Sequence, residues 1–320
     1  MTTLLYNHPV CLEHDMGYGH PECPDRLVAI YGALKQPVFA SIQWREAPAA
    51  TPEQLTRVHP QCYIDRIMAS VPKNGLRALD GDTALCPSSG EAALRAAGAI
   101  CAAVDAIMAG EADNAFCAVR PPGHHAEPSR AMGFCVFNNV AVGAVHARQV
   151  YGLGRVAIID FDVHHGNGTQ AVFEHQPEYM YLSSHQSPLY PGTGRSSERG
   201  VGNIVNLPLP PYSGSEEIRH GWASLMAPAL RNFRPDFIFI SAGFDAHRLD
   251  PLAQLNFTED DYAWLTQEIL DIAAEFCQGR VISTLEGGYN LSALAASVAV
   301  HVKALLEAPA LASQRKAWIA

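Results

Sequence analysis

The most constraining feature of this 320-residue sequence is a short apolar run that ends abruptly in acids and histidines. Residues 156–159 carry no charge, Asp160 follows them directly, and the segment lies between Gly154 and Gly166. An apolar, β-branched run of this length is typical of a strand buried on both faces of a parallel sheet. Because open α/β sheets bind ligands beyond the carboxyl ends of their strands, chemistry is expected at the polar end of this run.

Similar runs alternate with helical patterns along the whole chain. Strands are predicted at residues 4–6, 115–119, 156–159, 179–183, 204–207, 237–240 and 281–285. Helices are predicted at residues 27–34, 62–70, 91–109, 138–151, 216–233, 258–279 and 291–306. This order, without a linker, repeat or low-complexity tract, predicts one domain over residues 1–320. Its expected architecture is a three-layer α/β/α fold around a mainly parallel sheet.

Composition narrows the classes of protein that this chain can belong to. A formal net charge of -10 argues against binding to nucleic acid or anionic membranes and is compatible with a cationic substrate. The amino-terminal residues have no basic segment before an apolar one, so neither a signal peptide nor a membrane span is expected, and the predicted location is cytoplasmic. The 8 cysteines include no Cys-x-x-Cys pair, which favours reduced thiols over disulfides or a thiolate zinc site.

Four predicted strands deliver reactive side chains at the same end of the sheet. In extended chain Asp160, Asp162 and His164 share one side, and His165 points away. A carboxylate and an imidazole two residues apart can both bind a borderline metal such as zinc. An isolated Asp-x-His pair is as often a polar cap on a strand end as a metal site. Here, however, the other strand ends add His124, His125, Asp245 and Tyr289.

Five motifs carry a resemblance to a known family. They are Arg-Pro-Pro-Gly-His-His at 120–125, Asp-Phe-Asp-Val-His-His-Gly-Asn-Gly at 160–168, Tyr-Pro-Gly-Thr-Gly at 190–194, Ser-Ala-Gly-Phe-Asp at 241–245 and Glu-Gly-Gly-Tyr at 286–289. Together they resemble the histone deacetylase family, within the superfamily of bacterial class II-like histone deacetylases and acetylpolyamine amidohydrolases. The resemblance covers most of the chain and implies the arginase/deacetylase type of α/β fold.

The resemblance implies two kinds of metal site. Asp162, His164 and Asp245 match the ligands of one catalytic zinc per chain, with iron(II) as the alternative metal. A structural potassium site is implied for Asp160, Asp162, His164 and Ser183.

The implied activity is that of a hydrolase acting on linear amide bonds, in which the metal polarises an acetyl carbonyl and activates a water molecule. By resemblance Asp160 supports His124 and Asn167 supports His125. Since a carboxylate partner favours imidazolium and a neutral amide does not, His125 is expected to have the lower pKa and to be the better base. Tyr289 is expected to donate its phenol to the developing oxyanion.

Substrate preference is predicted from the residues that match the family's tunnel. Gly133, Phe134 and Tyr190 match its walls, and Asp82, in competition with Asp80, matches the acid at its rim. Polyamine-specific relatives carry an acid in the position matched here by Leu252, and His247 and Arg248 are expected to make this loop less favourable still for a polycation. The predicted substrate is therefore an acyl-lysine side chain in a peptide or protein, with an acetylated polyamine as the alternative.

Two more distant alternatives follow from the same residues. A two-metal ureohydrolase of the arginase type needs further acids, whereas Asp245 stands alone and His165-Gly166 follows where another acid would be needed. A non-catalytic acyl-lysine binding protein would be expected to lack Tyr289 or a metal ligand, and this chain retains them. No nucleic acid or membrane partner is predicted, and the oligomeric state, a homo-oligomer included, is left open.

Overall fold

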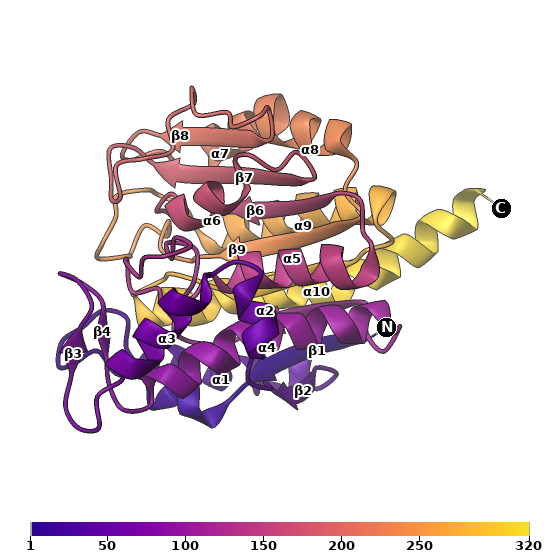
Figure 1. Ribbon diagram of the computed structural model, residues 1–320. Coiled ribbons are helices and arrows are strands. Elements are labelled where there is room, and N and C mark those ends of the chain that lie inside the picture. Colours follow the sequence, from indigo (N-terminus) through magenta and orange to yellow (C-terminus); the bar gives the residue numbers. More distant parts are fainter. Residues whose placement is uncertain (1, 320) are drawn as a thin grey trace.

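The computed structural model describes the backbone of residues 2–319 and the side chains of residues 2–308. Its centre is an eight-stranded sheet with the order β2-β1-β5-β10-β9-β6-β7-β8, in which every neighbouring pair is parallel (Figure 1). The strands are β1 (Thr3–Asn7), β2 (Gln43–Glu46), β5 (Asn114–Cys117), β6 (Val156–Asp160), β7 (Tyr179–Gln186), β8 (Ile204–Leu209), β9 (Phe237–Ala242) and β10 (Val281–Leu285). A separate antiparallel hairpin consists of β3 (Arg77–Ala78) and β4 (Ala84–Leu85).

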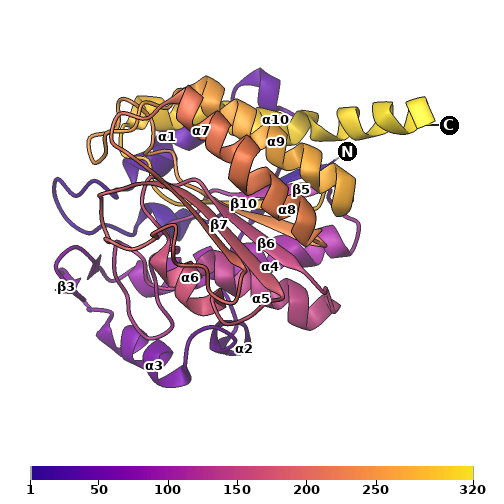
Figure 2. The same cartoon turned by 90° about the horizontal axis from the view of Figure 1, so that it is seen from above.

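Helices cover both faces of the sheet (Figure 2). One face carries α1 (Asp25–Leu34), α7 (Ser215–Gly221), α8 (Ala227–Phe233), α9 (Glu259–Phe276) and α10 (Leu291–Ile319). The other carries α2 (Pro52–Thr56), α3 (Gln61–Ser70), α4 (Ser89–Met108), α5 (Asn139–Tyr151) and α6 (Asn167–Phe173). The predicted three-layer α/β/α architecture with a parallel central sheet is confirmed, whereas the extent of the domain, residues 1–320, stays a prediction.

Burial explains why the central strands are so apolar. Every residue of β5, β6, β9 and β10 is buried, because each strand pairs on both sides and is covered by helices on both faces. In the edge strand β2 no residue is buried, and its sequence Gln-Trp-Arg-Glu has no apolar run. The sequence prediction therefore found the buried strands and missed β2.

The helix α10 combines strong apolarity with a place in the core. Its residues Leu291–Ala308 are long and apolar enough to cross a membrane, a test that core helices of soluble proteins also pass, and 39% of them are buried. Leu294, Val298, Val302 and Leu305 recur at helical spacing and belong to the hydrophobic core. The apolar side of this helix thus packs into the core, where α10 contacts α9, α1 and β5.

The structure differs from the prediction in several elements. Strand β7 continues through Gln186, three residues beyond the predicted end, although Ser184, His185 and Gln186 are polar. The predicted helix 216–233 is divided by a π-helical turn at Trp222–Met226, just before Pro228, which has no N–H to donate to the carbonyl of the preceding turn. The elements that were not predicted are β2, β3, β4, α2, α6 and the two 3-10 helices at Pro9–Leu12 and Pro37–Phe39.

Candidate active site

The predicted site residues meet at the carboxyl ends of the four central strands. β5, β10, β9 and β6 are consecutive neighbours in the sheet, so the loops that follow them converge although they are far apart in the sequence. These loops supply, in sheet order, His124 and His125, then Tyr289, then Asp245, and finally Asp162 with His164.

Asp162, His164 and Asp245 form a compact buried group. One potential ligand atom from each lies within 4.8 Å of the others, and no second group of this kind occurs among the described residues. Nδ1 of His164 lies 3.1 Å from Oδ1 of Asp162 and 3.2 Å from Oδ2 of Asp245. Backbone N–H groups fix the carboxylates, because Asp245 accepts a hydrogen bond from Val163 at 2.9 Å and Asp162 accepts one from Gly287 at 2.8 Å.

Two glycines make room for this group. A Cβ atom at Gly243 would collide with the carboxylate of Asp162, and one at Gly287 would collide with the carboxylates of both Asp162 and Asp245. The backbone therefore approaches the acids more closely than any other residue would allow.

The donor set fits a borderline divalent metal. One carboxylate oxygen of Asp162 and one of Asp245 lie 3.1 and 3.2 Å from Nδ1 of His164. Two ligands of a tetrahedral zinc are about this far apart when each lies about 2.0–2.1 Å from the ion. Three protein ligands leave coordination positions free, as a catalytic rather than a structural site requires. The residues present thus fit the metal that the sequence predicts, and its identity is taken up below.

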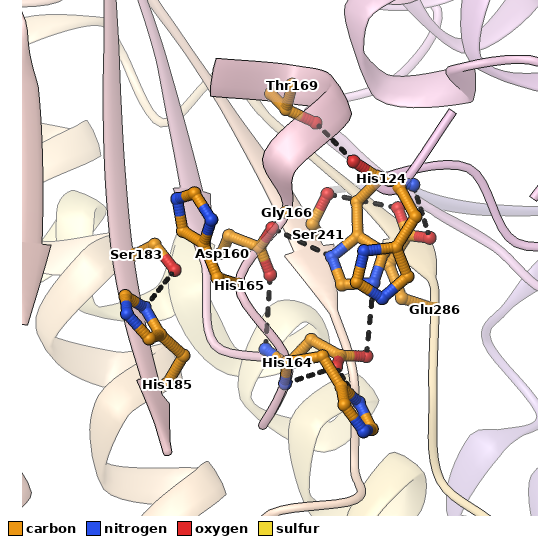
Figure 3. A network of polar contacts seen from close by, with 12 residues as sticks. His124, Asp160, His164, His165, Gly166, Thr169, Ser183, His185, Ser241 and Glu286 are labelled. Carbon is orange, nitrogen blue, oxygen red and sulfur yellow. Dashed lines mark hydrogen bonds and ion pairs between the residues drawn. The ribbon is translucent and has the colours of Figure 1, made fainter. Parts of the chain in front are cut away.

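His124 has a carboxylate partner. Its Nδ1 lies 3.0 Å from Oδ2 of Asp160, and its backbone N–H donates to Glu286 at 3.1 Å (Figure 3). Burial alone would lower the pKa of His124, but the carboxylates of Asp160, Asp162 and Glu286 together raise it well above the ordinary value. The imidazolium form of His124 is therefore favoured.

His125, beside it, has an amide partner instead. Its Nδ1 donates to Oδ1 of Asn167 at 2.8 Å, and the amide of Asn167 in turn donates to Glu127 at 2.9 Å. Burial, followed by the positive charges of His124 and His164, holds the pKa of His125 well below the ordinary value. The pKa of His125 is thus lowered and that of His124 raised, which gives His125 the lower pKa of the two, the order that the sequence predicts.

Tyr289 is positioned through its backbone and its ring. The backbone N–H of Tyr289 donates to Oδ2 of Asp250 at 2.7 Å. The Arg26 guanidinium lies 5.0 Å from the centre of the Tyr289 ring and donates to the carbonyl of Gly288 at 2.7 Å. Burial raises the pKa of Tyr289 well above the ordinary value, so the phenol keeps the proton that a hydrogen-bond donor needs.

A cavity of about 220 Å³ connects these groups with the surface. It is lined by Asp82, Pro122, His124, His125, Gly133, Phe134, His164, Leu189, Tyr190, Leu252, Gly287 and Tyr289. All five predicted substrate-contact residues are among them. His247 and Arg248 do not line the cavity, and His247 is buried with its Nε2 3.5 Å from Glu259. Their expected effect on a polycation stays a prediction.

Two consecutive residues in the left-handed region form one wall of this cavity. Gly133 has φ 57° and Phe134 has φ 67°, and a Cβ atom at Gly133 would collide with the His125 ring. The N–H of Gly133 donates to Oδ1 of Asp82 at 3.2 Å, and that of Phe134 donates to the Thr83 hydroxyl at 3.0 Å. The Thr83 hydroxyl also donates to Oδ1 of Asp82 at 2.8 Å, so the rim acid and Thr83 hold the wall together.

The predicted potassium ligands lie next to the metal group. Asp160 and Ser183 are register partners in β6 and β7, and the Ser183 hydroxyl pairs with Nδ1 of His185 at 2.9 Å (Figure 3). Asp160 accepts hydrogen bonds from the N–H of Asp162 at 3.2 Å and from the hydroxyl of Tyr181 at 2.9 Å. Potassium binding by these residues stays a prediction.

Three residues that touch the site were not found from the sequence. The buried Glu286 accepts hydrogen bonds from the N–H groups of Gly123 and His124 and from the Ser241 hydroxyl. Asp250 and Arg26 position Tyr289. For Glu286 a signal existed, because it is an acid placed directly after the buried strand β10, but Arg26 and Asp250 are brought to the site only by the fold.

Comparison with known proteins agrees with this geometry. The model of the histone deacetylase domain matches residues 20–305. Histone deacetylase 14, chloroplastic, of Arabidopsis thaliana is 42% identical over 97% of this chain and 78% of its own length. Polyamine deacetylase HDAC10 of Homo sapiens is 37% identical over 97% of this chain and 49% of its own length. The crystal structure of the HDA15 HD domain superposes with a TM-score of 0.90 at 36% identity, covering 95% of this chain and 88% of that one.

The fold and the site together define a hydrolytic deacetylase. The chain belongs to the histone deacetylase family. The non-catalytic alternative considered from the sequence is thereby set aside, and the arginase-like architecture is that of the family itself.

Proposed function

We propose that this protein is a zinc-dependent deacetylase that removes an acetyl or related acyl group from the ε-amine of lysine in peptides or proteins. The single observation that carries the proposal is the cavity lined by His124, His125 and His164, where two histidines of opposite pKa shift lie beside the ligand set of Asp162, His164 and Asp245. A bound zinc ion would polarise the acyl carbonyl and lower the pKa of a water molecule.

The protein's own residues supply the remaining steps. His125, which is neutral, accepts the proton of the attacking water and passes it to the departing lysine amine. His124, which is charged and fixed by Asp160, places a positive charge where negative charge develops. The Tyr289 phenol donates a hydrogen bond to the same developing oxyanion, with Arg26 and Asp250 as positioning residues.

The lining of the cavity supports acyl-lysine over a polyamine. A polyamine carries a second ammonium beyond the acetylated nitrogen, and burying this cation without a partner is costly. Among the described residues the only acid that lines the cavity is Asp82, and its Oδ1 already accepts two hydrogen bonds from the protein. Leu252, 37% exposed at the same cavity, offers no charge. The second candidate, deacetylation of acetylpolyamines, is kept because a relative named a polyamine deacetylase spans 97% of this chain.

The test is kcat/KM for an acetyl-lysine peptide against N-acetylputrescine and N8-acetylspermidine under identical conditions. We expect the peptide to be preferred, and higher values for the polyamines would reject the proposal. Leu252→Glu is expected to move the ratio toward polyamines. Leu249→Glu is the matched control, since Leu249 is 55% exposed on the same loop but does not line the cavity.

The proposed metal is tested by elemental analysis of the purified protein. One equivalent of zinc per chain is expected, with Asp245→Ala losing it; two equivalents, both required for activity, would favour a two-metal hydrolase instead. If the analysis finds iron(II) in place of zinc, the identity of the metal is corrected and the proposed ligand set is kept. The cytoplasmic location stays a prediction.

A further inference from the structure

A second cavity, of about 320 Å³, lies between α3 and the hairpin strand β3. Figures 1 and 2 both place these two elements side by side. Arg66 of α3, Arg77 of β3 and Arg130 of the loop before Gly133 all line it. Three positive side chains thus converge on one hollow in a protein whose formal net charge is -10.

The positive charge of this cavity is not neutralised by the protein. Among the described residues the arginine salt bridges involve other arginines, and none is formed by Arg66, Arg77 or Arg130. Arg66 is held in place, because it donates to the Ser129 carbonyl at 2.7 Å and lies 5.3 Å from the centre of the Tyr63 ring. All three arginines are exposed, and Arg66 is also held in place by these contacts, so the cavity presents one fixed guanidinium and two without a salt bridge among the described residues.

A serine hydroxyl also lies in the cavity lining. Ser70 lines the cavity and is 8% exposed, yet its hydroxyl makes no hydrogen bond with any residue that the structure describes. The hydroxyl is therefore free to donate to a ligand that the three arginines hold.

We propose that this cavity binds a compact oxyanion, a carboxylate or phosphate group, held by Arg66, Arg77 and Arg130 and by the Ser70 hydroxyl. Guanidinium groups donate in a planar fork that matches carboxylate and phosphate oxygens, and such charge-assisted hydrogen bonds are stronger than neutral ones. The anion has two sources, a free anion or an acidic or phosphorylated residue of the peptide substrate. The second source rests on the proposed function.

The peptide source is within reach of the deacetylation site. Arg130 is three residues before Gly133, and Leu79 of the cavity is three residues before Asp82 of the rim. Three extended residues span about 10 Å, so the backbone of the arginine cavity lies no further than that from the tunnel wall. A carboxylate or phosphate a few residues from the acyl-lysine can therefore occupy the cavity while the lysine occupies the tunnel.

The binding test uses the full chain and inorganic phosphate, measured by isothermal titration calorimetry at constant ionic strength. Saturable binding is expected, and Arg77→Gln and Arg130→Gln should each weaken it by about tenfold, which is the loss of one charge-assisted hydrogen bond. Arg155→Gln is the matched control, because Arg155 is exposed, forms no salt bridge among the described residues, does not line the cavity, and lies directly before the first residue of β6, at the amino end of that strand. Absence of saturable binding, or equal weakening in the control, overturns the proposal. Circular dichroism melting establishes that each variant is folded.

The second measurement identifies the source of the anion. Acetyl-lysine peptides with glutamate or phosphoserine two residues from the lysine are compared with their glutamine and serine forms. A higher kcat/KM for the anionic peptides that disappears in Arg77→Gln assigns the site to the substrate. Phosphate binding without any peptide preference assigns it to a free anion. If no peptide is deacetylated, the proposed function fails, while the phosphate titration still decides on the anion site.

Discussion

Replacing Thr83 with valine tests how the left-handed wall of the tunnel is held. Thr83 is 1% exposed, and valine keeps its shape but removes the hydroxyl that donates to Asp82 and accepts from the Phe134 N–H. The Phe134 N–H then loses its partner, at a cost of about 1–3 kcal/mol, and the bond to the Asp82 carboxylate is lost as well. We take about 2 kcal/mol as the free energy by which the variant destabilises the closed wall. This corresponds to about a 30-fold increase in the population in which the Gly133-Phe134 wall is detached from residues 82–83.

Two assays follow this change. Hydrogen exchange measured by mass spectrometry on a peptide that contains Phe134 should accelerate by up to about 30-fold in Thr83→Val. The KM for a short acyl-lysine substrate should rise more than kcat falls, because the wall positions the substrate and does not touch the reacting atoms. Thr83→Ser keeps the hydroxyl and should remain within about threefold of the unaltered protein in both assays. Equal behaviour of the valine and serine variants would refute the reasoning, because the hydroxyl would then have no part in holding the wall.

Three further predictions concern catalysis and stability. Tyr289→Phe should keep the fold and the metal content but lower kcat by about 100- to 1000-fold, and unchanged turnover would remove the phenol from the mechanism. His125→Ala should be at least as damaging to kcat as His124→Ala, and the reverse order would overturn the assignment of His125 as the base. Burial lowers the pKa of His301 from 6.5 to about 3. Between pH 6.5 and about pH 3 the unfolded chain therefore binds a proton that the folded chain does not. The stability that His301 contributes is complete above pH 6.5 and declines as the pH falls. His301→Gln should therefore reduce the pH dependence of the unfolding free energy between pH 4 and 5.5 by as much as about 1.4 kcal/mol per pH unit, measured by urea melts, and an unchanged slope would contradict this.

The elements that could be predicted from the sequence are helices whose apolar residues recur at helical spacing and strands that consist of a buried apolar run. β6 and β9 were located within two residues, because their charge-free sequences match only a strand covered on both faces. The missed end of β7 is polar, and it is buried because His185 and Gln186 pair with β8. Nε2 of His185 also donates to the Gly194 carbonyl, and its Nδ1 accepts from the Ser183 hydroxyl. Partners of this kind lie outside any local sequence window.

The same distinction applies to the site. Residues at strand ends could be found, because the ends of parallel strands must share one edge of the sheet. Arg26 could not, since it reaches Gly288 from 262 positions away in the sequence. Thr83 could not either, because its hydroxyl has a role only through Phe134 and Asp82, and a buried threonine after an acidic loop has no pattern that distinguishes it from a turn residue.

The position of β10 has a consequence for how this chain is made. β10 is the last strand in the sequence but lies in the middle of the sheet, and it alone pairs β5 with β9. During synthesis we therefore expect β2, β1 and β5 to stay separate from β9, β6, β7 and β8 until residues 281–285 emerge from the ribosome, with an open hydrogen-bonding edge on each side. His124 and His125 belong to one half, and Asp162, His164 and Asp245 belong to the other. We expect a nascent or truncated chain that stops before Val281 to expose two unpaired strand edges, which promote aggregation. Its two groups of catalytic residues would also remain apart, so we expect hydrolysis only after β10 has joined the two halves of the sheet.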